Sequence, residues 1–201
     1  MYLNIILQTE GGFEKWFVLN LETIIITLVF GVIAGVISAV TFYYLMKLIK
    51  PNIEISEHIA RRQINNNGVT EYEYIIKIIN HTSSNVEDVS YQLFIMEDYF
   101  HGTGKNYSAR ELEFKGANSM KFLTGKEEKN DSYHDNCRQI RIKGDLEGEW
   151  DKKKEWLQFQ IVSYHSKSGS RHVHKRKYTN PSVTIKDGIF DSGETFNILT
   201  E

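Results

Sequence analysis

The longest apolar stretch of the chain runs from Thr23 to Met46 and contains no charged residue and no proline. A stretch of this length can cross the ~30 Å hydrocarbon core of a bilayer as one helix. Pro51 follows closely, and a proline disfavours helical backbone at the residue before it. The predicted divisions of the chain are a segment at residues 1–22, a transmembrane helix at 23–48 and a further domain at 51–201.

From residue 51 onward, apolar and polar residues alternate in short runs, which is the pattern of half-buried β-strands. Many short strands at about 8–12-residue spacing predict a sandwich or a barrel. The strands are expected at residues 53–55, 71–79, 86–96, 140–142, 156–164, 171–178, 183–185, 188–190 and 195–199, with a hairpin over 112–123. Residues 101–108 and 125–136 are expected to be loops.

Charges on the two sides of the apolar stretch predict its orientation. The flanking residues are Glu10, Glu14, Lys15 and Glu22 on the N-terminal side and Lys47, Lys50, Arg61 and Arg62 on the C-terminal side. Because basic residues favour the cytoplasmic side, we expect the N-terminus outside and residues 51–201 in the cytoplasm. The single cysteine, Cys137, excludes an internal disulfide and fits a reducing compartment.

At about 100° per residue, the predicted helix has a bulky side and a side of small or hydroxylated residues. Gly31, Gly35 and Ala39 lie on the small side at a spacing of four, which lets helix backbones approach closely. We therefore expect the helices to self-associate through these residues. The candidates to line a pore in such an assembly are Thr27, Ala34, Ser38 and Thr41. A plain membrane anchor remains the alternative.

Short segments with strand and turn patterns follow the helix in a fixed order, at residues 51–56, 67–68, 74–80, 88–93, 168–169, 173–178 and 185–190. This order of features resembles the cytoplasmic domain of inward-rectifier potassium channels. The chain has no TVGYG-type filter, pore helix or second span, so potassium selectivity is not implied. The resemblance implies an all-β, immunoglobulin-like sandwich, preceded by a single N-terminal transmembrane helix, that packs around an axis as a homo-oligomer, with a tetramer favoured.

In architecture, the chain is similar to small bacterial anti-phage effectors, which join one or two spans to a β-rich cytoplasmic domain that senses a nucleotide signal. Examples are the two-span β-strand effectors of cyclic-oligonucleotide systems and the Hailong membrane effector, a channel controlled by DNA oligomers. This likeness implies a bacterial inner-membrane protein with a nucleotide or oligonucleotide ligand and a nucleotidyltransferase partner.

Residues 165–178 form the most concentrated basic stretch in a chain of net charge −2. The candidate ligand-binding residues are Lys167, Arg171, Lys175, Arg176, Lys177 and Tyr178. The cations would bind phosphates, and a base could stack on Tyr178 or Trp156. Two alternatives stay open: a solvated edge strand whose charges oppose aggregation, and contact with anionic membrane lipid. His172 and His174 alone do not make a zinc site, so no metal is expected.

The chain contains no phosphate-binding glycine loop, nucleophile elbow, HExxH or paired-acid motif. We expect neither a catalytic residue nor a cofactor, and no enzyme activity. The favoured function is an oligomeric membrane effector, an ion-conducting channel or pore gated by a cytoplasmic nucleotide or oligonucleotide in anti-phage defence. The alternative is a membrane-tethered binding module that recruits a protein partner without conduction.

Overall fold

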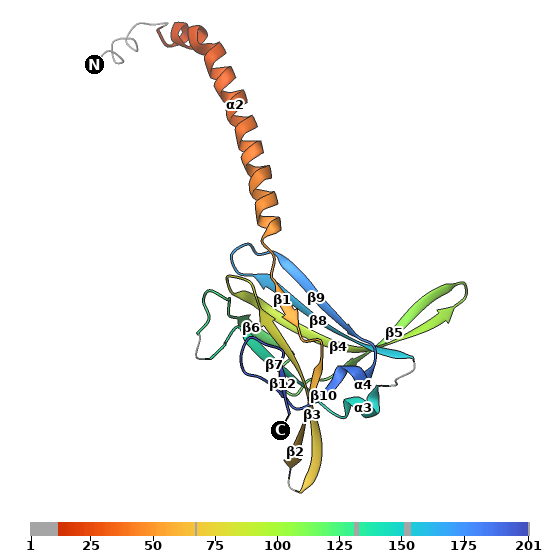
Figure 1. The fold of residues 1–201 in the computed structure, drawn as a ribbon. Helices are drawn as coiled ribbons and strands as arrows, with labels where there is room; N and C mark the ends of the chain where they lie inside the picture. The colour runs from red at the N-terminus through yellow and green to blue at the C-terminus, as the bar shows by residue number, and fades with distance from the viewer. Residues whose placement is uncertain (1–11, 67, 131–132, 151–153, 201) are drawn as a thin grey trace. The chain divides into compact units, whose positions relative to one another are not determined.

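The computed structural model describes residues 12–66, 68–130, 133–150 and 154–200. These residues form two compact units, a helix that ends at Leu48 and a β-rich unit that begins at Ile49 (Figure 1). The helices are α2 (Gly12–Leu48), α3 (Leu146–Glu149) and α4 (Pro181–Thr184). The strands are β1 (Ile53–Ile55), β2 (Ile59–Asn66), β3 (Val69–Asn80), β4 (Val86–His101), β5 (Gly104–Leu112), β6 (Ser119–Leu123), β7 (Cys137–Ile142), β8 (Glu155–His165), β9 (Arg171–Tyr178), β10 (Ile185–Asp187), β11 (Ile189–Phe190) and β12 (Ile198–Leu199).

Helix α2 confirms the prediction of one long apolar helix near the N-terminus. Its stretch Lys15–Met46 is long and apolar enough to cross a membrane. The helix begins at Gly12, eleven residues before the predicted start, because no proline or glycine interrupts residues 13–22. The side-chain amide of Asn20 donates to the carbonyl of Trp16 (2.8 Å) within this added part. Residues 1–11 of the predicted N-terminal segment lie outside the described residues.

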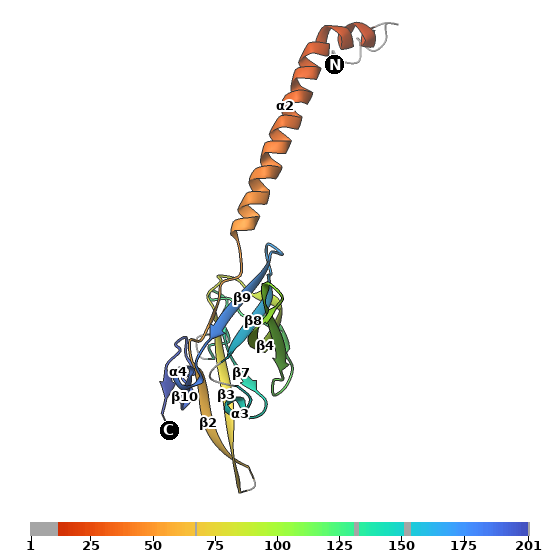
Figure 2. The ribbon, with the colours of Figure 1, turned by 90° about the vertical axis from the view of Figure 1, so that its right-hand side faces the viewer.

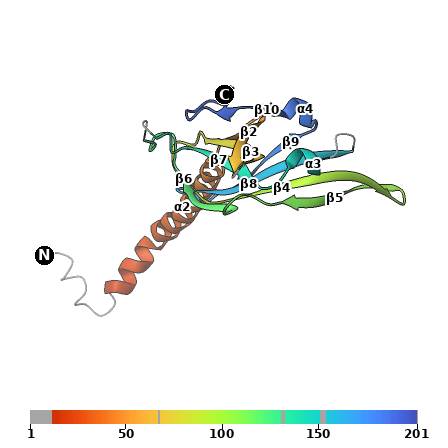
Figure 3. The ribbon, with the colours of Figure 1, turned by 90° about the horizontal axis from the view of Figure 1, so that it is seen from below.

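The β-rich unit is a sandwich of two sheets, as predicted. In the first sheet β3 is central, with β1 and β2 along one edge and β7 along the other, and β10 continues the sheet beyond β2. In the second sheet β4 pairs with β8 on one edge and with β5 and β6 on the other, and β9 is the outer strand beside β8. Figure 3 shows the two sheets as stacked layers, and Figure 2 shows β8 and β9 side by side.

The core lies between the two sheets and is filled by alternate residues of each strand. Ile76 of β3, Leu93 of β4 and Phe159 of β8 are fully buried. The rings of Tyr91 and Phe114 meet edge to face with centroids 4.9 Å apart, a geometry that adds stabilisation beyond burial. The predicted alternation of β3 and β4 is confirmed by this core, except that Tyr72 is exposed.

Three predicted local structures are wrong. The stretch 112–123 is not a hairpin, because β5 and β6 both pair with β4 while residues 113–115 bond to β7 of the other sheet. Residues 101–108 are not a loop, since β4 and β5 pair up to His101 and Gly104. Val183 is helical rather than extended, because the side chain of Asn180 accepts from the Ser182 amide and starts the single turn α4.

The C-terminal segment covers the outer face of the first sheet. Phe190 packs with Ala60 and Ile75 in a small second core, and the Gln139 side chain donates to the Phe190 carbonyl (3.3 Å). Lys77, fully buried on the same face, donates through Nζ to the carbonyls of Asp191, Gly193 and Thr195. Cys137 shares this face, because it stands opposite Ile79 in the β3–β7 register.

Candidate functional site: the basic strand and the segment after the helix

The predicted basic strand is β9, an edge strand of the second sheet. Its residues alternate between exposed and half-buried positions, as the sequence predicts. Arg171, Val173, Lys175 and Lys177 lie on the outer side, and each stands opposite an outward residue of β8. The strand therefore has one face for solvent and one face for the rest of the sandwich.

The outer face of β9 presents its cations beside aromatic and amide groups of β8. The Lys177 ammonium lies 4.2 Å from the centre of the Trp156 ring, within the range of a cation–π contact. Lys175 stands opposite Gln160, whose side chain donates to Gln92 (2.7 Å). Among the described residues, no carboxylate pairs with the outer cations, which include Lys167 in the β8–β9 turn. This face is exposed and positively charged, so it can contact an extended anion.

The inner side of β9 does not belong to a ligand surface, which corrects two of the predicted residues. Tyr178 is only 2 % exposed, and its hydroxyl donates to the Ser56 carbonyl (2.8 Å). This burial raises the pKa of the phenol and prevents the ring from stacking on a base. Arg176 donates to the Ile55 carbonyl (3.0 Å) and contacts Glu57 (3.4 Å), so its guanidinium holds β1.

His174 also faces the segment that follows the helix. Its Nε2 accepts a hydrogen bond from the Ile53 amide (3.5 Å), so the ring is neutral. Burial first, and then the neighbouring His172, lower the pKa of His174 to about 4. The two imidazoles meet edge to face at 4.6 Å. Within the described parts of the chain, no three His, Cys, Asp or Glu residues are placed to hold a metal ion.

The β8–β9 turn binds the first residue after the helix. The hydroxyls of Ser168 and Ser170 donate to the Ile49 carbonyl at 3.0 and 2.6 Å. His165 orients this turn, because its Nδ1 accepts from the Ser168 amide (3.1 Å). Its other nitrogen is therefore protonated and donates to the Ser84 hydroxyl (2.9 Å). Sequence reasoning missed this function of the serines, since a Ser-Gly-Ser run indicates only a turn.

Together, these bonds hold residues 49–56 against β9 and its turn. Ile53 and Ile55 are buried. Both belong to β1, which pairs with the C-terminal end of β3. The side chain of Thr82 accepts from the Asn52 amide (2.8 Å). Ile49 follows Leu48, the last residue of α2, directly in the chain.

The predicted helix residues all lie within α2. A Cβ at Gly31 or Gly35 would have no atom within 4 Å, so the single chain places no constraint on either residue. The Thr27 hydroxyl donates to the Thr23 carbonyl (2.7 Å), which satisfies it within the helix. Ala34, Ser38, Ala39 and Thr41 are exposed in the isolated helix.

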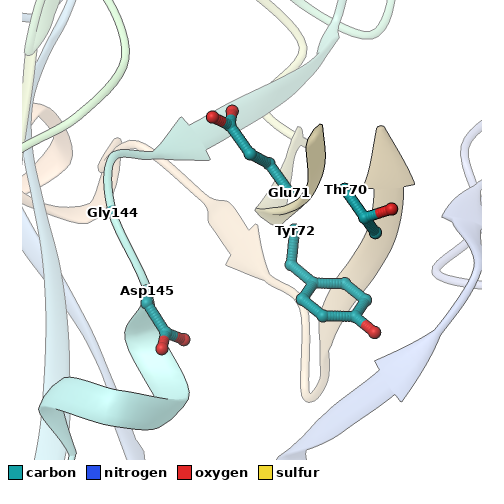
Figure 4. Close-up of a pocket in the computed structure, with 5 residues that line it drawn as sticks. All are labelled: Thr70, Glu71, Tyr72, Gly144 and Asp145. Atoms are coloured by element: carbon teal, nitrogen blue, oxygen red, sulfur yellow. The ribbon is translucent and has the colours of Figure 1, made fainter. Parts of the chain in front are cut away.

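A cavity of about 410 Å³ lies beside the β2–β3 hairpin and the start of α3, and Figure 4 shows the residues that line it. They are Thr70, Glu71, Tyr72, Gly144 and Asp145. The carboxylate of Glu71 and the ring of Tyr72 point in different directions in Figure 4. Two acids and no cation line this cavity, so it does not suit a phosphate group.

Comparison with known protein families finds no match to this chain. Comparison with curated proteins finds no similar sequence either. The assignment of function therefore depends on the geometry of β9, residues 49–56 and α2.

Proposed function

We propose that this protein is an oligomeric effector of a bacterial inner membrane, a channel whose cytoplasmic sandwich is controlled by a nucleotide or oligonucleotide in anti-phage defence. The observation that carries the proposal is the division of β9 into two faces. Its outer cations are free to bind phosphates, and its inner side chains hold the segment that follows the helix.

The connection between ligand and helix uses few groups. A polyanion bound to Lys175 and Lys177 would contact the same strand that carries His174 and Arg176. Those two side chains contact Ile53 and Ile55. A ligand shifts a conformational equilibrium only through different affinities for the two states. In this proposal the two states differ in how β9 holds residues 49–56.

The assembly uses the small side of α2. Gly31, Gly35 and Ala39 would form the helix contacts, and Thr27, Ala34, Ser38 and Thr41 would face the axis of a homo-oligomer, a tetramer by preference. The N-terminus lies on the extracytoplasmic side of the membrane in this arrangement, and a nucleotidyltransferase supplies the signal. The acidic and basic flanks of the apolar stretch support this orientation.

The experiment measures ion flux from proteoliposomes that contain the full chain, with and without a single-stranded DNA hexamer as the anionic probe. We expect the hexamer to change the flux, and Lys175→Glu/Lys177→Glu to reduce that response at least about tenfold, because each reversal repels phosphate. The double change Lys126→Glu/Lys186→Glu is the control, since both lysines are exposed elsewhere.

Ser168→Ala/Ser170→Ala removes the hydroxyls that hold Ile49. It should keep binding of the hexamer but weaken the flux response. A protein that is strictly monomeric in detergent would exclude the channel. Equal responses of the wild type and the β9 double variant would exclude β9 as the ligand surface.

A tethered binding module without conduction is the second candidate, and the β4–β5 hairpin favours it. Its projecting end exposes the aromatic rings of Tyr99, Phe100 and Tyr107 to 43 %, 80 % and 61 %, and large exposed aromatics are typical of protein contacts. Proteoliposomes that show no flux at all, with an oligomer intact in detergent, would favour this candidate.

A further inference from the structure

The side of the sandwich opposite β9 contains a cationic cleft that the sequence does not reveal. Residues 113–115 leave β5 and bond to β7, where the Lys115 amide donates to the Arg141 carbonyl (2.8 Å). The chain then turns at Gly116, with φ +110°, and returns to the second sheet as β6. A cavity of about 500 Å³ lies between this turn and β7.

The lining of this cleft has a single sign of charge. Among the described residues that line it, Lys115, Arg138 and Arg141 are cationic and none is acidic. The remaining lining residues are Tyr91, Gly116, Ala117, Ser119, Met120, Cys137, Gln139 and Ile140. Lys115 precedes β6, whereas the two arginines belong to β7. The three cations are therefore separated in the sequence, and no run of basic residues indicates the site.

A buried carboxylate fixes two of these cations in place. Glu73 is 4 % exposed, and its carboxylate lies 3.3 Å from Lys115 Nζ and 3.5 Å from Arg141 Nε. Its shortest ion pair is with Arg62 (2.7 Å). One carboxylate thus serves three cations, and Arg138 adds a fourth at the cleft. The excess of positive charge at this cluster is left for a ligand to neutralise.

We propose that this cleft binds a small molecule that carries a diphosphate group. Its volume is in the range of small-molecule sites, about 300–1,000 Å³. Arginine pairs with phosphate through two parallel hydrogen bonds, and lysine binds it as a point charge. Arg138, which has no carboxylate partner among the described residues, fits one phosphate, and Arg141 and Lys115, which share Glu73, fit the adjacent one. The cleft is on the edge of the sandwich away from β9, so this site is independent of the proposed function.

Calorimetry on the full chain in detergent tests the site with two probes, inorganic pyrophosphate and ADP. We expect Arg138→Glu to weaken binding of pyrophosphate by at least about tenfold, because reversal of one contact replaces attraction with repulsion. Arg138→Lys keeps the charge but loses the paired hydrogen bonds, so it should weaken binding less than Arg138→Glu does. Lys175→Glu, the matched reversal on β9, should change the affinity less than about twofold, since it lies on the opposite side.

The two probes distinguish the sources of the diphosphate. ADP that binds more tightly than pyrophosphate identifies a nucleotide ligand, and the reverse order identifies inorganic diphosphate. Arg138 is exposed, so its reversal should leave the fold intact, which circular dichroism checks. The proposal is overturned if neither probe binds, or if Arg138→Glu leaves the affinity unchanged. Loss of binding only in Lys175→Glu would place the phosphate on β9 instead.

Discussion

At the scale of single residues, Lys77 shows how a charge can organise a buried surface. It sits in the apolar run of β3, where alternation alone would place it at the surface. Its ammonium is instead fully buried and donates to three carbonyls of the C-terminal segment. Burial lowers its pKa, and the nearby Cys137 and Asp191 oppose that shift. The three carbonyls take the place of water, which makes the burial of this charge tolerable.

Lys77→Met should therefore lower the free energy of unfolding by about 1–3 kcal/mol, because buried carbonyls are left without donors. Unfolding in denaturant, followed by the tryptophan fluorescence to which the buried Trp150 contributes, measures the change. Lys175→Met is the matched control and should stay within about 0.5 kcal/mol of the wild type, since its side chain is exposed. Equal stability of the two variants would show that the three bonds contribute nothing.

At the scale of elements, β9 joins two tasks in one strand. Its outer residues form a charged edge, which also discourages pairing with another sheet. Its inner residues bond to the amides and carbonyls of residues 53–56. Two neutral histidines accept backbone hydrogen bonds here: His174 in the strand and His165 beside the turn. Burial lowers the pKa of both imidazoles, and Lys167 further lowers that of His165.

This element predicts a loss of stability in mild acid. The folded pKa of His174, about 4, is below its ordinary value near 6.5. The unfolded chain therefore binds more protons between these values, and the free energy of unfolding falls as the pH drops from about 6.5 toward 4. His174→Gln should flatten the dependence between about pH 7 and pH 5, above the range in which carboxylates titrate.

The control for this measurement is His101→Gln, at the exposed end of the β4–β5 hairpin. Its unfolding free energy should follow the wild type across the same pH range. A His174→Gln protein with the full wild-type dependence would mean that another group, such as His165, governs the acid response.

The sequence predicts elements better than their partners. The alternation of apolar and polar residues predicted β8, and β9 with one exposed side, because strand periodicity is a local property of the sequence. It could not show that Tyr178 is covered, since the covering residue, Ser56, is 122 positions away. Nor could it place residues 113–115 against β7, a pairing that depends on which sheet the chain enters. The cleft of Lys115, Arg138 and Arg141 stayed hidden for the same reason, as three residues from two segments make it.

At the scale of the whole molecule, the question is whether the helices of several chains meet. α2 carries Gly31 and Gly35 where a side chain would touch nothing in the single chain. A bulky residue there clashes with nothing in the single chain and favours the helix over glycine, so a loss of assembly would come from contacts between chains. Substitutions in this helix therefore test assembly without a steric clash inside the single chain.

Gly35→Leu should weaken self-association by about tenfold or more, because a larger side chain separates backbones that small residues allow to pack. Mass measurement of the full chain in detergent across a dilution series reports the shift toward monomer. Val36→Leu, on the bulky side of α2, should keep the wild-type mass. Ion flux that persists in Gly35→Leu at the wild-type level would remove this helix face from the channel proposal.

The placement of Cys137 gives this protein a built-in chemical reporter. Its thiol shares the sheet face that the C-terminal segment covers, is partly buried, and has a pKa raised by that burial. Since the chain has one cysteine, a thiol-reactive dye would label a single sulfur. The labelling rate then follows how accessible this thiol is, both on the sheet face and in the cleft of Lys115, Arg138 and Arg141, which Cys137 also lines.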